Sequence, residues 1–523
     1  MNVVEIVREH AERLPSSVAL IDTYRGQPRQ TTFHDFEQAA GRTATLLREL
    51  GLHSGDLVLV FHPMSSELYI ALGALLRLGL VAMFVDPSAG RHHIDRCCEM
   101  HRPRAMIASG KAHWLRLLSR ELRRIPCKLS IGARVPGAVP IEAGGKCRYD
   151  PSIYQCSGNE PALVSFTSGS TGEPKATQRT HGFLRSQHAA IAGNLDLSAG
   201  EIELVSLPIF VLANLASCVT SVIPNVDLRR PDAVDAAPVV AQIQRHDVTR
   251  VTAPPAFCER LAEYCESKRI YLPQLKKVFT GGGPVPLRHM QRLQRIAPQA
   301  VITAVYGSTE AEPISQISLA EVGPNDSAAM HDGRGLLAGR PVPDIQLRII
   351  DDQWGKQVAL GDTSEFDRLC QPVGVVGEIV VSGEHVLHNY LKDFAEDENK
   401  FRVGSARWHR TGDAGYIDVS GRLWLLGRCA ARVVDEHGDI YPLGVEHAAL
   451  QHAFVRRAAF VAFREKRVLV VELQRRVARP DLRALLESLS FASVDSVQVV
   501  KRLPVDRRHN TKIDYAALRG LLS

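Results

Sequence analysis

Two stretches of this chain combine hydroxyl, glycine and charged residues in a way that suits a phosphate-bearing ligand. The first is FTSGSTGEPKAT at 166–177, where positions 167–172 hold four hydroxyls and two glycines and Lys175 follows. Gly lets backbone N–H groups approach a phosphate, and Ser and Thr hydroxyls add donors. Because Ala176 follows Lys175, this is not a Walker loop. The same composition also suits a plain turn, so both interpretations stay open here.

The second stretch is VYGSTE at 305–310, at the end of an apolar run. Tyr306 offers an aromatic face for a base, and Thr309 offers a hydroxyl for a phosphate. Glu310 offers a carboxylate for a divalent cation. The stretch therefore suits a nucleotide bound with a metal ion.

Two later stretches add one charged group each. In WHRTGD at 408–413, Asp413 follows a glycine, where its carboxylate can accept both hydroxyls of a ribose. In DRRHNTKID at 506–514, Lys512 stands in a polar loop before a helical start. Each stretch alone is weak, since a lone Asp or Lys usually lies on a solvated surface.

Hydrophobic periodicity predicts the elements that would carry these residues. Before residue 110, an amphipathic helix at 36–50 alternates with strands at 56–61 and 80–85, which indicates a largely parallel, helix-covered sheet. The region 111–160 is rich in Arg, Gly and Pro and is interpreted as a surface excursion. A second α/β system is predicted from strands that recur along the middle of the chain, at 162–166, 203–207, 248–252, 277–280 and 301–305.

The pattern of apolar residues in the sequence changes after about residue 340. Strands at 345–350 and 377–381 lie between turns and indicate a mainly antiparallel β unit. From Gly427 onward a short α+β piece is predicted, with strands at 459–463 and 468–473.

Composition limits the possible partners. The 523 residues exceed one hydrophobic core, and 45% apolar with 23% charged residues is typical of folded proteins. A net charge of +6 without one long basic run argues against nucleic acid as a partner and leaves room for a polyanionic small ligand. Ten cysteines show no metal-ligand spacing and are interpreted as reduced thiols.

We find no secretory signal and no apolar stretch long enough for a transmembrane segment. We therefore expect a cytoplasmic protein.

In their order and spacing, these stretches resemble the adenylate-forming superfamily of acyl- and aryl-CoA ligases, peptide-synthetase adenylation domains and luciferases. The resemblance covers nearly the whole chain. It rests on SFTSGSTGEPK, FTGGGPV at 279–285, VYGSTEA, HRTGD, GRLWLLGR at 421–428 and NTKID. Within that superfamily, LPIFVLANLA, YGSTEAEPIS and PVDRRHNTKI are most similar to the β-lactone synthetases of bacterial olefin pathways.

The resemblance implies an α/β fold with two domains. Residues 1–427 would form a large domain of two helix-covered sheets with a β-rich subdomain at about 340–427. Residues 428–523 would form a small, mobile α+β domain that carries Lys512.

The resemblance also assigns a nucleotide site. Residues of the first stretch would close over the β- and γ-phosphates of ATP, namely Thr167, Ser168, Gly169, Ser170, Thr171, Gly172 and Lys175. A glycine turn and an aromatic turn would flank the adenine, namely Gly281, Gly282, Gly283, Tyr306, Gly307 and Ser308. Asp413 and Arg428 would bind the ribose.

The resemblance implies that a substrate carboxylate attacks the α-phosphorus and yields acyl-AMP and pyrophosphate. Thr309 would contact the α-phosphate, Glu310 would hold Mg²⁺, and Lys512 would reach in from the small domain. Both reactants are anionic, so the two cations must neutralise charge as it develops. A carboxylate is already ionised near pH 7, so no general base is required.

The acyl site is predicted around 207–224, with Phe210, Leu212 and Asn214 as candidates. The helical apolar spacing of this segment is also typical of a plain core. His181 is either a contact in the acyl site or a helix-start residue.

Three departures from the usual pattern bear on the second step. The segment 429–431, Cys-Ala-Ala, stands at the hinge where relatives commonly carry Lys and Asp. FVAFREKRVLVVEL lacks the acidic, glycine-containing loop of CoA ligases, and 207–224 lacks a histidine that many relatives carry. These departures favour β-lactone closure of a β-hydroxy fatty acid, in which no second substrate enters.

Two alternatives remain. One is a thioester ligase that uses CoA or a carrier-protein thiol. The other is a non-catalytic nucleotide-binding scaffold. The expected partner is a small-molecule carboxylic acid, and pathway enzymes or a carrier protein are further candidates.

Overall fold

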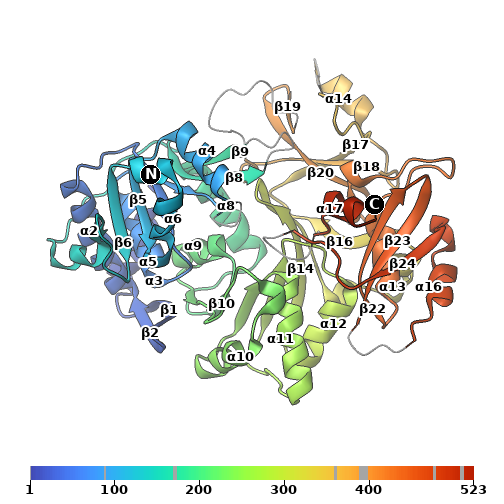
Figure 1. The fold of residues 1–523 in the computed structure, drawn as a ribbon, viewed down its shortest axis with the longest axis horizontal. Helices are drawn as coiled ribbons and strands as arrows, with labels where there is room; N and C mark the ends of the chain where they lie inside the picture. The colour runs from blue at the N-terminus through green and yellow to red at the C-terminus, as the bar shows by residue number, and fades with distance from the viewer. Residues whose placement is uncertain are drawn as a thin grey trace. The chain divides into compact units, whose positions relative to one another are not determined.

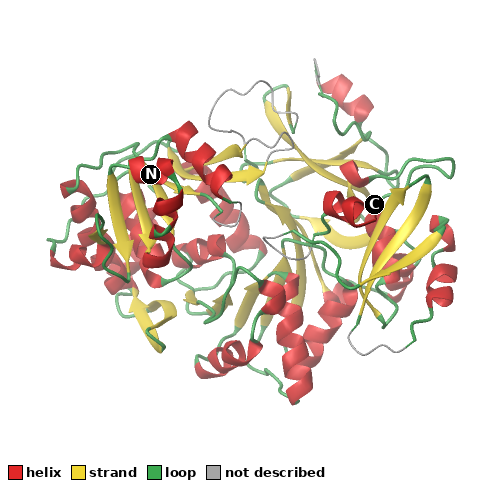
Figure 2. Ribbon diagram, in the orientation of Figure 1, coloured by secondary structure: helices red, strands yellow, loops and turns green. Residues whose placement is uncertain are grey.

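The computed structural model describes residues 2–86, 90–168, 174–358, 362–387, 399–474, 479–506 and 512–522. The chain divides into two compact units. The first comprises Met1–Asn225 and a short segment from Leu387, and the second comprises the remainder. Figure 1 shows the elements of both units, and Figure 2 shows that helices flank the strands in each. Among the residues described, no helix has the length and apolarity to cross a bilayer.

The first unit contains a seven-stranded sheet in the order β7-β6-β5-β3-β4-β8-β9. Its pairs are parallel except the last, in which β9 returns antiparallel to β8. The strands are β3 (Leu57–Phe61), β4 (Val81–Phe84), β5 (Ala105–Ser109), β6 (Cys127–Ile131), β7 (Val139–Pro140), β8 (Pro161–Ser168) and β9 (Pro174–Thr180). The central strands are apolar runs because helices cover both faces of a parallel sheet.

Four further strands of this unit lie in the order β10-β11-β1-β2. They are β1 (Val18–Tyr24), β2 (Gln27–Thr32), β10 (Ile202–Val205) and β11 (Thr220–Val222). The helices are α1 (Val4–Arg13), α2 (Phe33–Glu49), α3 (Ser66–Arg77), α4 (Arg91–His101), α5 (Gly110–His113), α6 (Leu115–Leu118), α7 (Arg120–Arg124), η2 (Ile141–Lys146), α8 (His181–Asn194) and α9 (Pro208–Ala216). Thr32 and Asp35 form a capping box that fixes the start of α2.

The second unit begins with a parallel α/β part and continues into an antiparallel part. β12 (Arg250–Ala253), β13 (Lys277–Gly281) and β14 (Val301–Ser308) are parallel neighbours. Antiparallel pairs then join β15 (Ala311–Ser318), β16 (Leu336–Pro341), β17 (Gln346–Ile350), β18 (Gly377–Ser382), β19 (Lys400–Val403), β20 (Ala406–Ile417) and β21 (Leu423–Arg428). The predicted antiparallel strands at 345–350 and 377–381 are present as β17 and β18, and antiparallel pairing already begins at β15.

The helices of this part are η3 (Pro231–Ala233), α10 (Ala236–Arg245), α11 (Pro255–Lys268), α12 (Leu287–Ile296), η4 (Leu319–Glu321), α13 (Pro324–His331) and α14 (Thr363–Leu369). A three-stranded sheet follows in the order β22-β23-β24 and has a core of its own, including Val445, Phe460, Leu469 and Leu485. Its elements are η5 (Cys429–Ala431), α15 (Pro442–Ala449), β22 (Val455–Phe463), β23 (Lys466–Leu473), α16 (Leu482–Ser488), η6 (Ser490–Ala492), β24 (Ser496–Val500) and α17 (Tyr515–Leu522).

The predicted fold class is confirmed: two helix-covered α/β systems, a β-rich part and a small α+β part. The assignment of the strand at 162–166 to the second α/β system was wrong, because β8 pairs with β4 in the seven-stranded sheet of the first unit. The separation into domains at 427/428, and the mobility of the second, stay predictions. The interpretation of 111–160 as a surface excursion was wrong in part. β6 is a parallel strand inside the seven-stranded sheet, with Leu129 and Ile131 buried. Its alternating run CKLSI is too short for periodicity to identify among so many Arg and Gly residues.

Candidate active site

A hairpin tip in the second unit carries Thr309 and Glu310. β14 ends at Ser308, β15 starts at Ala311, and these two residues pair across the turn. The Ser308 hydroxyl accepts the N–H groups of Glu310 and Ala311, each at 3.2 Å, and so holds the turn closed. Thr309 and Glu310 are both partly exposed, as a substrate contact and a metal ligand would need to be.

The predicted adenine and ribose residues meet in one hydrogen-bonded group. Asp413 and Arg428 are directly opposite on β20 and β21, and Asp413 Oδ1 lies 3.1 Å from Arg428 Nε. The Tyr306 hydroxyl donates to Asp413 Oδ2 at 2.8 Å. Burial, together with Asp413, raises the pKa of Tyr306 well above 10, so the hydroxyl stays protonated and remains a donor. Asp413 is thus held from two sides.

The glycine turn at 281–283 follows β13 directly beside the strand that carries Tyr306. Gly281 pairs with Val305, and a Cβ on Gly281 would come within 2.4 Å of the Val305 carbonyl oxygen. Gly282 has φ +82°, which side-chain-bearing residues rarely adopt. The close approach therefore requires glycine at 281, and the positive φ favours glycine at 282. Gly283 is the next residue.

The HRTGD stretch is anchored by a buried ion pair. Arg410 and Glu378 expose 1% and 0% of their side chains, and Arg410 Nη2 lies 2.6 Å from Glu378 Oε2. Arg410 also donates to the Lys356 carbonyl at 2.6 Å. Gly412 has φ +69° and lies against the Trp354 ring. The sequence analysis assigned no role to Arg410 or Glu378, which hold the strand three residues before Asp413.

The phosphate stretch includes the end of β8 and the start of β9, which pair antiparallel. Thr167 pairs with Lys175, and Ser168 pairs with Pro174. Gly169, Ser170, Thr171 and Gly172 lie outside the described residues, and the Thr167, Ser168 and Lys175 side chains are likewise not described. The predicted strand before this stretch is confirmed as β8, whereas the turn and its contact with phosphate stay predictions.

The acyl-site candidates lie on α9. Asn214 is fully buried and donates from Nδ2 to Glu203 Oε2 at 2.6 Å and to Ser221 Oγ at 3.0 Å, so it ties α9 to β10 and β11. Phe210 is also buried. Both therefore serve the packing of the first unit, and a contact with substrate stays a prediction.

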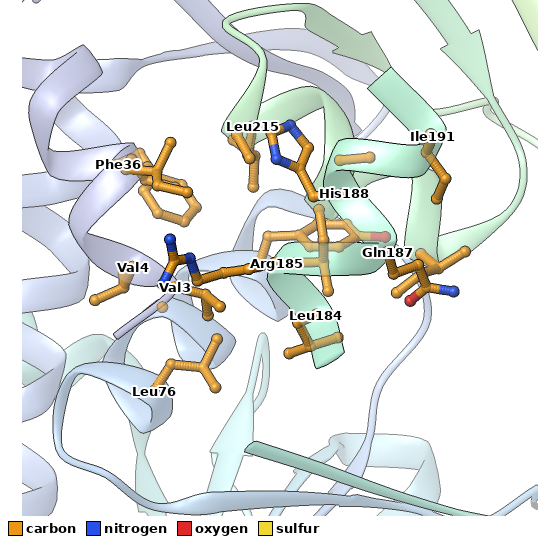
Figure 3. Close-up of a pocket in the computed structure, with 18 residues that line it drawn as sticks. Val3, Val4, Phe36, Leu76, Leu184, Arg185, Gln187, His188, Ile191 and Leu215 are labelled. Carbon is orange, nitrogen blue, oxygen red and sulfur yellow. The ribbon is translucent and has the colours of Figure 1, made fainter. Parts of the chain in front are cut away.

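Leu212 lines an apolar cavity of about 70 Å³ within the first unit. Figure 3 shows its walls, formed by side chains of α1, α2, α3, α8 and α9, including Phe36, Leu76, Gln187 and Leu215. A dry cavity of roughly 150 Å³ holds a benzene ring, so this smaller cavity does not by itself form the site of a long acyl chain.

His181 is the first residue of α8 and is buried. Its Nδ1 accepts the Val3 N–H at 3.3 Å, and burial lowers its pKa to about 4, so the ring is neutral near pH 7. These contacts agree with the helix-start interpretation.

The predicted hinge residues form η5, with Cys429 and Ala431 buried. The next residue supplies the polar contacts that alanine cannot make, because Arg432 Nη1 lies 3.3 Å from both Asp352 and Asp439. Arg432 was not among the residues predicted from the sequence. Its position directly after the predicted hinge segment was the feature of the sequence that could have identified it.

Hydrogen bonds join Asp506 and Lys512 to each other and join Tyr515 to Glu446 of α15. Lys512 N–H donates to Asp506 Oδ1 at 2.9 Å, and Asp506 N–H donates to the Lys512 carbonyl at 2.8 Å. The Tyr515 hydroxyl donates to Glu446 Oε1 at 2.6 Å, and the same oxygen accepts the Phe460 N–H at 3.0 Å. Glu446 therefore anchors the chain just after the lysine.

Glu446 is expected to make stability depend on pH. Burial raises its pKa to about 7 from an ordinary 4.5. Between these values the folded protein binds more protons than the unfolded chain, so stability falls as pH rises through this window. Glu446→Gln cannot ionise and should be about 3 kcal/mol more stable than the wild type at pH 8, but similar at pH 4.

Urea unfolding of both proteins at pH 4, 6 and 8 measures this difference. Glu487→Gln is the control, because the Glu487 side chain is 65% exposed and should leave the profile unchanged. Parallel profiles for wild type and Glu446→Gln would contradict the assignment.

Glu310 fits the predicted Mg²⁺ ligand in its chemistry. Mg²⁺ usually takes one or two carboxylates, several waters and the phosphates of its substrate. A single partly exposed carboxylate at a hairpin tip meets that requirement. Within the described ranges, no group of three or more His, Cys, Asp or Glu residues could hold a metal by itself.

Comparison with known proteins is consistent with this geometry. The AMP-binding enzyme family matches residues 7–391. The chain is 32% identical to an olefin beta-lactone synthetase of Stenotrophomonas maltophilia, over 92% of this chain and 89% of that protein. It is 30% identical to an olefin beta-lactone synthetase of Xanthomonas campestris, over 91% and 89%. A 2-succinylbenzoate–CoA ligase of Bacillus licheniformis is 27% identical over 86% and 85%.

Solved structures share the fold. The anthranilate CoA ligase AuaEII in complex with anthranoyl-AMP superimposes with a TM-score of 0.85 at 17% identity, covering 100% of this chain and 97% of that one. The amide bond synthetase McbA of Marinactinospora thermotolerans has a TM-score of 0.80 at 21% identity, with 100% of both chains covered. The matched family, the full-length relatives and the grouped Tyr306, Asp413 and Arg428 agree, and the chain therefore belongs to the AMP-binding enzymes and is an adenylate-forming ligase.

Proposed function

We propose that this enzyme converts a long-chain β-hydroxy carboxylic acid and ATP into a β-lactone, AMP and pyrophosphate. The observation that carries the proposal is the likeness to two olefin beta-lactone synthetases over about nine-tenths of the chain. ATP use belongs to the family, whereas the acid and the lactone are the proposed part.

The first step joins the acid to AMP. A carboxylate oxygen of the acid attacks the α-phosphorus, the bond to the β-phosphate oxygen breaks, and pyrophosphate leaves. Asp413 would accept the ribose hydroxyls while Arg428 and Tyr306 keep its carboxylate in place. Lys512 and the residues of the 167–175 stretch would bind the phosphates. Mg²⁺, held by Glu310, would neutralise phosphate charge when bound.

The second step takes place within the acyl-adenylate. The β-hydroxyl oxygen attacks the acyl carbon, the bond to the AMP oxygen breaks, and the hydroxyl proton is released. The ring closes without a thiol.

Two features of the small sheet support a step without CoA. β22 and β23 are joined by a two-residue turn, since Phe463 pairs with Lys466. Arg464 and Glu465 have φ of +50° and +60°, as expected in a tight hairpin. This turn leaves no room for the longer loop that the sequence analysis found missing.

The test is mass spectrometry of a reaction with ATP, Mg²⁺ and a 2-alkyl-3-hydroxy acid, without a thiol. We expect a product lighter than the acid by one water, together with AMP. The matched control is the same acid without its hydroxyl, which should support pyrophosphate exchange and give no such product. A product that appears only with CoA or a carrier thiol would overturn the lactone proposal. It would favour a thioester ligase, which the 27% identity to 2-succinylbenzoate–CoA ligases supports.

Pyrophosphate exchange across fatty and hydroxy acids separates both enzymes from the remaining alternative. Exchange with any of them supports adenylation. Silence with all of them would favour a nucleotide-binding scaffold.

Tyr306→Phe is expected to raise the apparent KM for ATP roughly fivefold while the KM for the acid stays within about twofold. The variant removes the donor to Asp413 Oδ2, and such a hydrogen bond contributes about 1 kcal/mol. Steady-state kinetics with each substrate varied measures both constants. Tyr416→Phe is the control, because Tyr416 lies on β20 with Asp413 but its hydroxyl donates to the Arg334 carbonyl. Equal effects of the two variants would contradict the assigned role.

A further inference from the structure

The first unit presents three large apolar side chains to solvent within five consecutive residues. Trp114, Leu117 and Leu118 are 69%, 66% and 61% exposed. α5 and α6 are separated only by Trp114, whose φ of −61° and ψ of −26° are helical. The spacing i, i+3, i+4 places the three side chains on one face of this helical stretch. We call them the apolar turn.

The other face of the stretch is anchored. His113 is buried, and its Nε2 lies 3.0 Å from the Leu129 carbonyl of β6. Ala112 and Leu115 pack against the core beneath the sheet. Figure 1 shows α5 and α6 beside β5 and β6. The apolar turn is therefore held outward by an ordered support.

The carbonyl groups at the end of the stretch are satisfied within the protein. Arg123 Nη1 donates to the carbonyls of Arg116 and Leu117, each at 2.9 Å. The end of the stretch therefore presents few polar backbone groups that would need water in an apolar environment.

Basic residues surround the apolar turn. Residues 111–124 contain five Lys and Arg against Glu121 alone, and Lys111, Arg120, Arg123 and Arg124 are exposed. Over residues 91–148 there are thirteen Lys and Arg against four Asp and Glu. The whole chain has 63 against 57, which leaves 50 against 53 elsewhere. The positive charge of the protein is thus concentrated around this segment.

We propose that the apolar turn and its basic surround bind the surface of an anionic lipid bilayer. Trp and Leu side chains enter the boundary between headgroups and acyl chains, while Lys and Arg pair with lipid phosphates. The charge asymmetry selects an anionic bilayer, because attraction to anionic lipid depends on clustered basic residues. This binding is separate from the proposed function and does not depend on it.

The experiment is sedimentation of the full-length protein with sucrose-loaded vesicles. One set contains phosphatidylcholine and phosphatidylglycerol at a 3:1 ratio, and the other contains phosphatidylcholine alone. We expect wild-type protein to sediment with the anionic vesicles, to remain largely in solution with the neutral ones, and to bind less in 0.5 M NaCl. Failure to sediment with anionic vesicles would overturn the proposal. That result would also be found if the patch instead bound a partner protein.

Two variants assign the binding to this segment. Lys111→Gln with Arg120→Gln should lower the partition coefficient about 25-fold, at about fivefold for each basic residue near the surface. Leu117→Ser with Leu118→Ser should weaken binding at least tenfold, since both side chains are exposed and their loss leaves the core intact. Tyr271→Ser and Arg402→Gln are matched controls, because they change an exposed aromatic and an exposed basic residue of the second unit. Equal losses in the controls would contradict the assignment to 111–124.

Tryptophan fluorescence reports insertion directly. The protein has four tryptophans, and Trp114 is the most exposed of them. Trp408 and Trp424 are 5% and 3% exposed, and Trp354 is partly exposed. Anionic vesicles should shift the emission to shorter wavelength. Trp114→Phe should remove the shift while the protein still sediments. A shift that survives in Trp114→Phe would overturn the placement of this residue in the lipid.

Discussion

Replacing Lys512 with alanine is expected to lower kcat for acyl-adenylate formation about a hundredfold. In the proposed reaction, a carboxylate approaches an anionic α-phosphate, and the Lys512 ammonium compensates the charge that develops. Loss of one preorganised group of this kind costs on the order of 3 kcal/mol in the transition state. The side chain is partly exposed, so folding should be unaffected. Pyrophosphate exchange with the preferred acid measures the rate.

Lys501→Ala is the matched control, because Lys501 is an exposed lysine that follows β24 in the same small sheet. Its exchange rate should stay within about twofold of the wild type. A second measurement supplies the acyl-adenylate directly. Because no attack on phosphorus remains in that reaction, Lys512→Ala should consume the intermediate within a few-fold of the wild-type rate. If adenylation were unimpaired in Lys512→Ala, the assignment of this residue would be wrong.

Replacing Glu378 with alanine is expected to cost about 3 to 5 kcal/mol of stability. The change leaves the Arg410 guanidinium, 1% exposed, without the carboxylate that accepts three of its hydrogen bonds at 2.6 to 3.1 Å. An unpaired buried charge is among the most destabilising consequences of a single substitution. Urea unfolding measures the loss, and a fall in soluble yield is the equivalent result for a protein that no longer folds.

Two further variants separate burial from pairing. Arg483→Ala breaks the ion pair between Arg483 and Glu487, whose side chains are 89% and 65% exposed, respectively. This change should cost at most about 0.5 kcal/mol of stability. The double variant Glu378→Leu with Arg410→Met removes both charges and should recover most of the stability that Glu378→Ala loses. Comparable losses in Glu378→Ala and Arg483→Ala would show that the buried pair is not the anchor of this strand.

The candidate site was predictable to the extent that its chemistry is local in the sequence. Thr309 and Glu310 follow an apolar run, and a strand that ends in Gly-Ser-Thr-Glu already indicates a polar turn at a strand end. The position of Lys512 in a polar loop before a helix could also be predicted from the sequence. The apolar runs at 56–61 and 80–85 predicted buried parallel strands, because continuous burial leaves no alternation in the sequence.

By itself, the sequence determined which residues stand at the ends of strands and in which order they follow, since periodicity and turn chemistry are properties of neighbouring positions. Only the tertiary structure decided which of them meet. Tyr306 and Asp413 are 107 residues apart and Arg410 and Glu378 are 32 apart, and both contacts depend on strand order and register, which side-chain alternation does not encode. The outward face of Trp114, Leu117 and Leu118 was decided in the same way, because an apolar helical turn is buried or exposed according to what the rest of the chain packs against it.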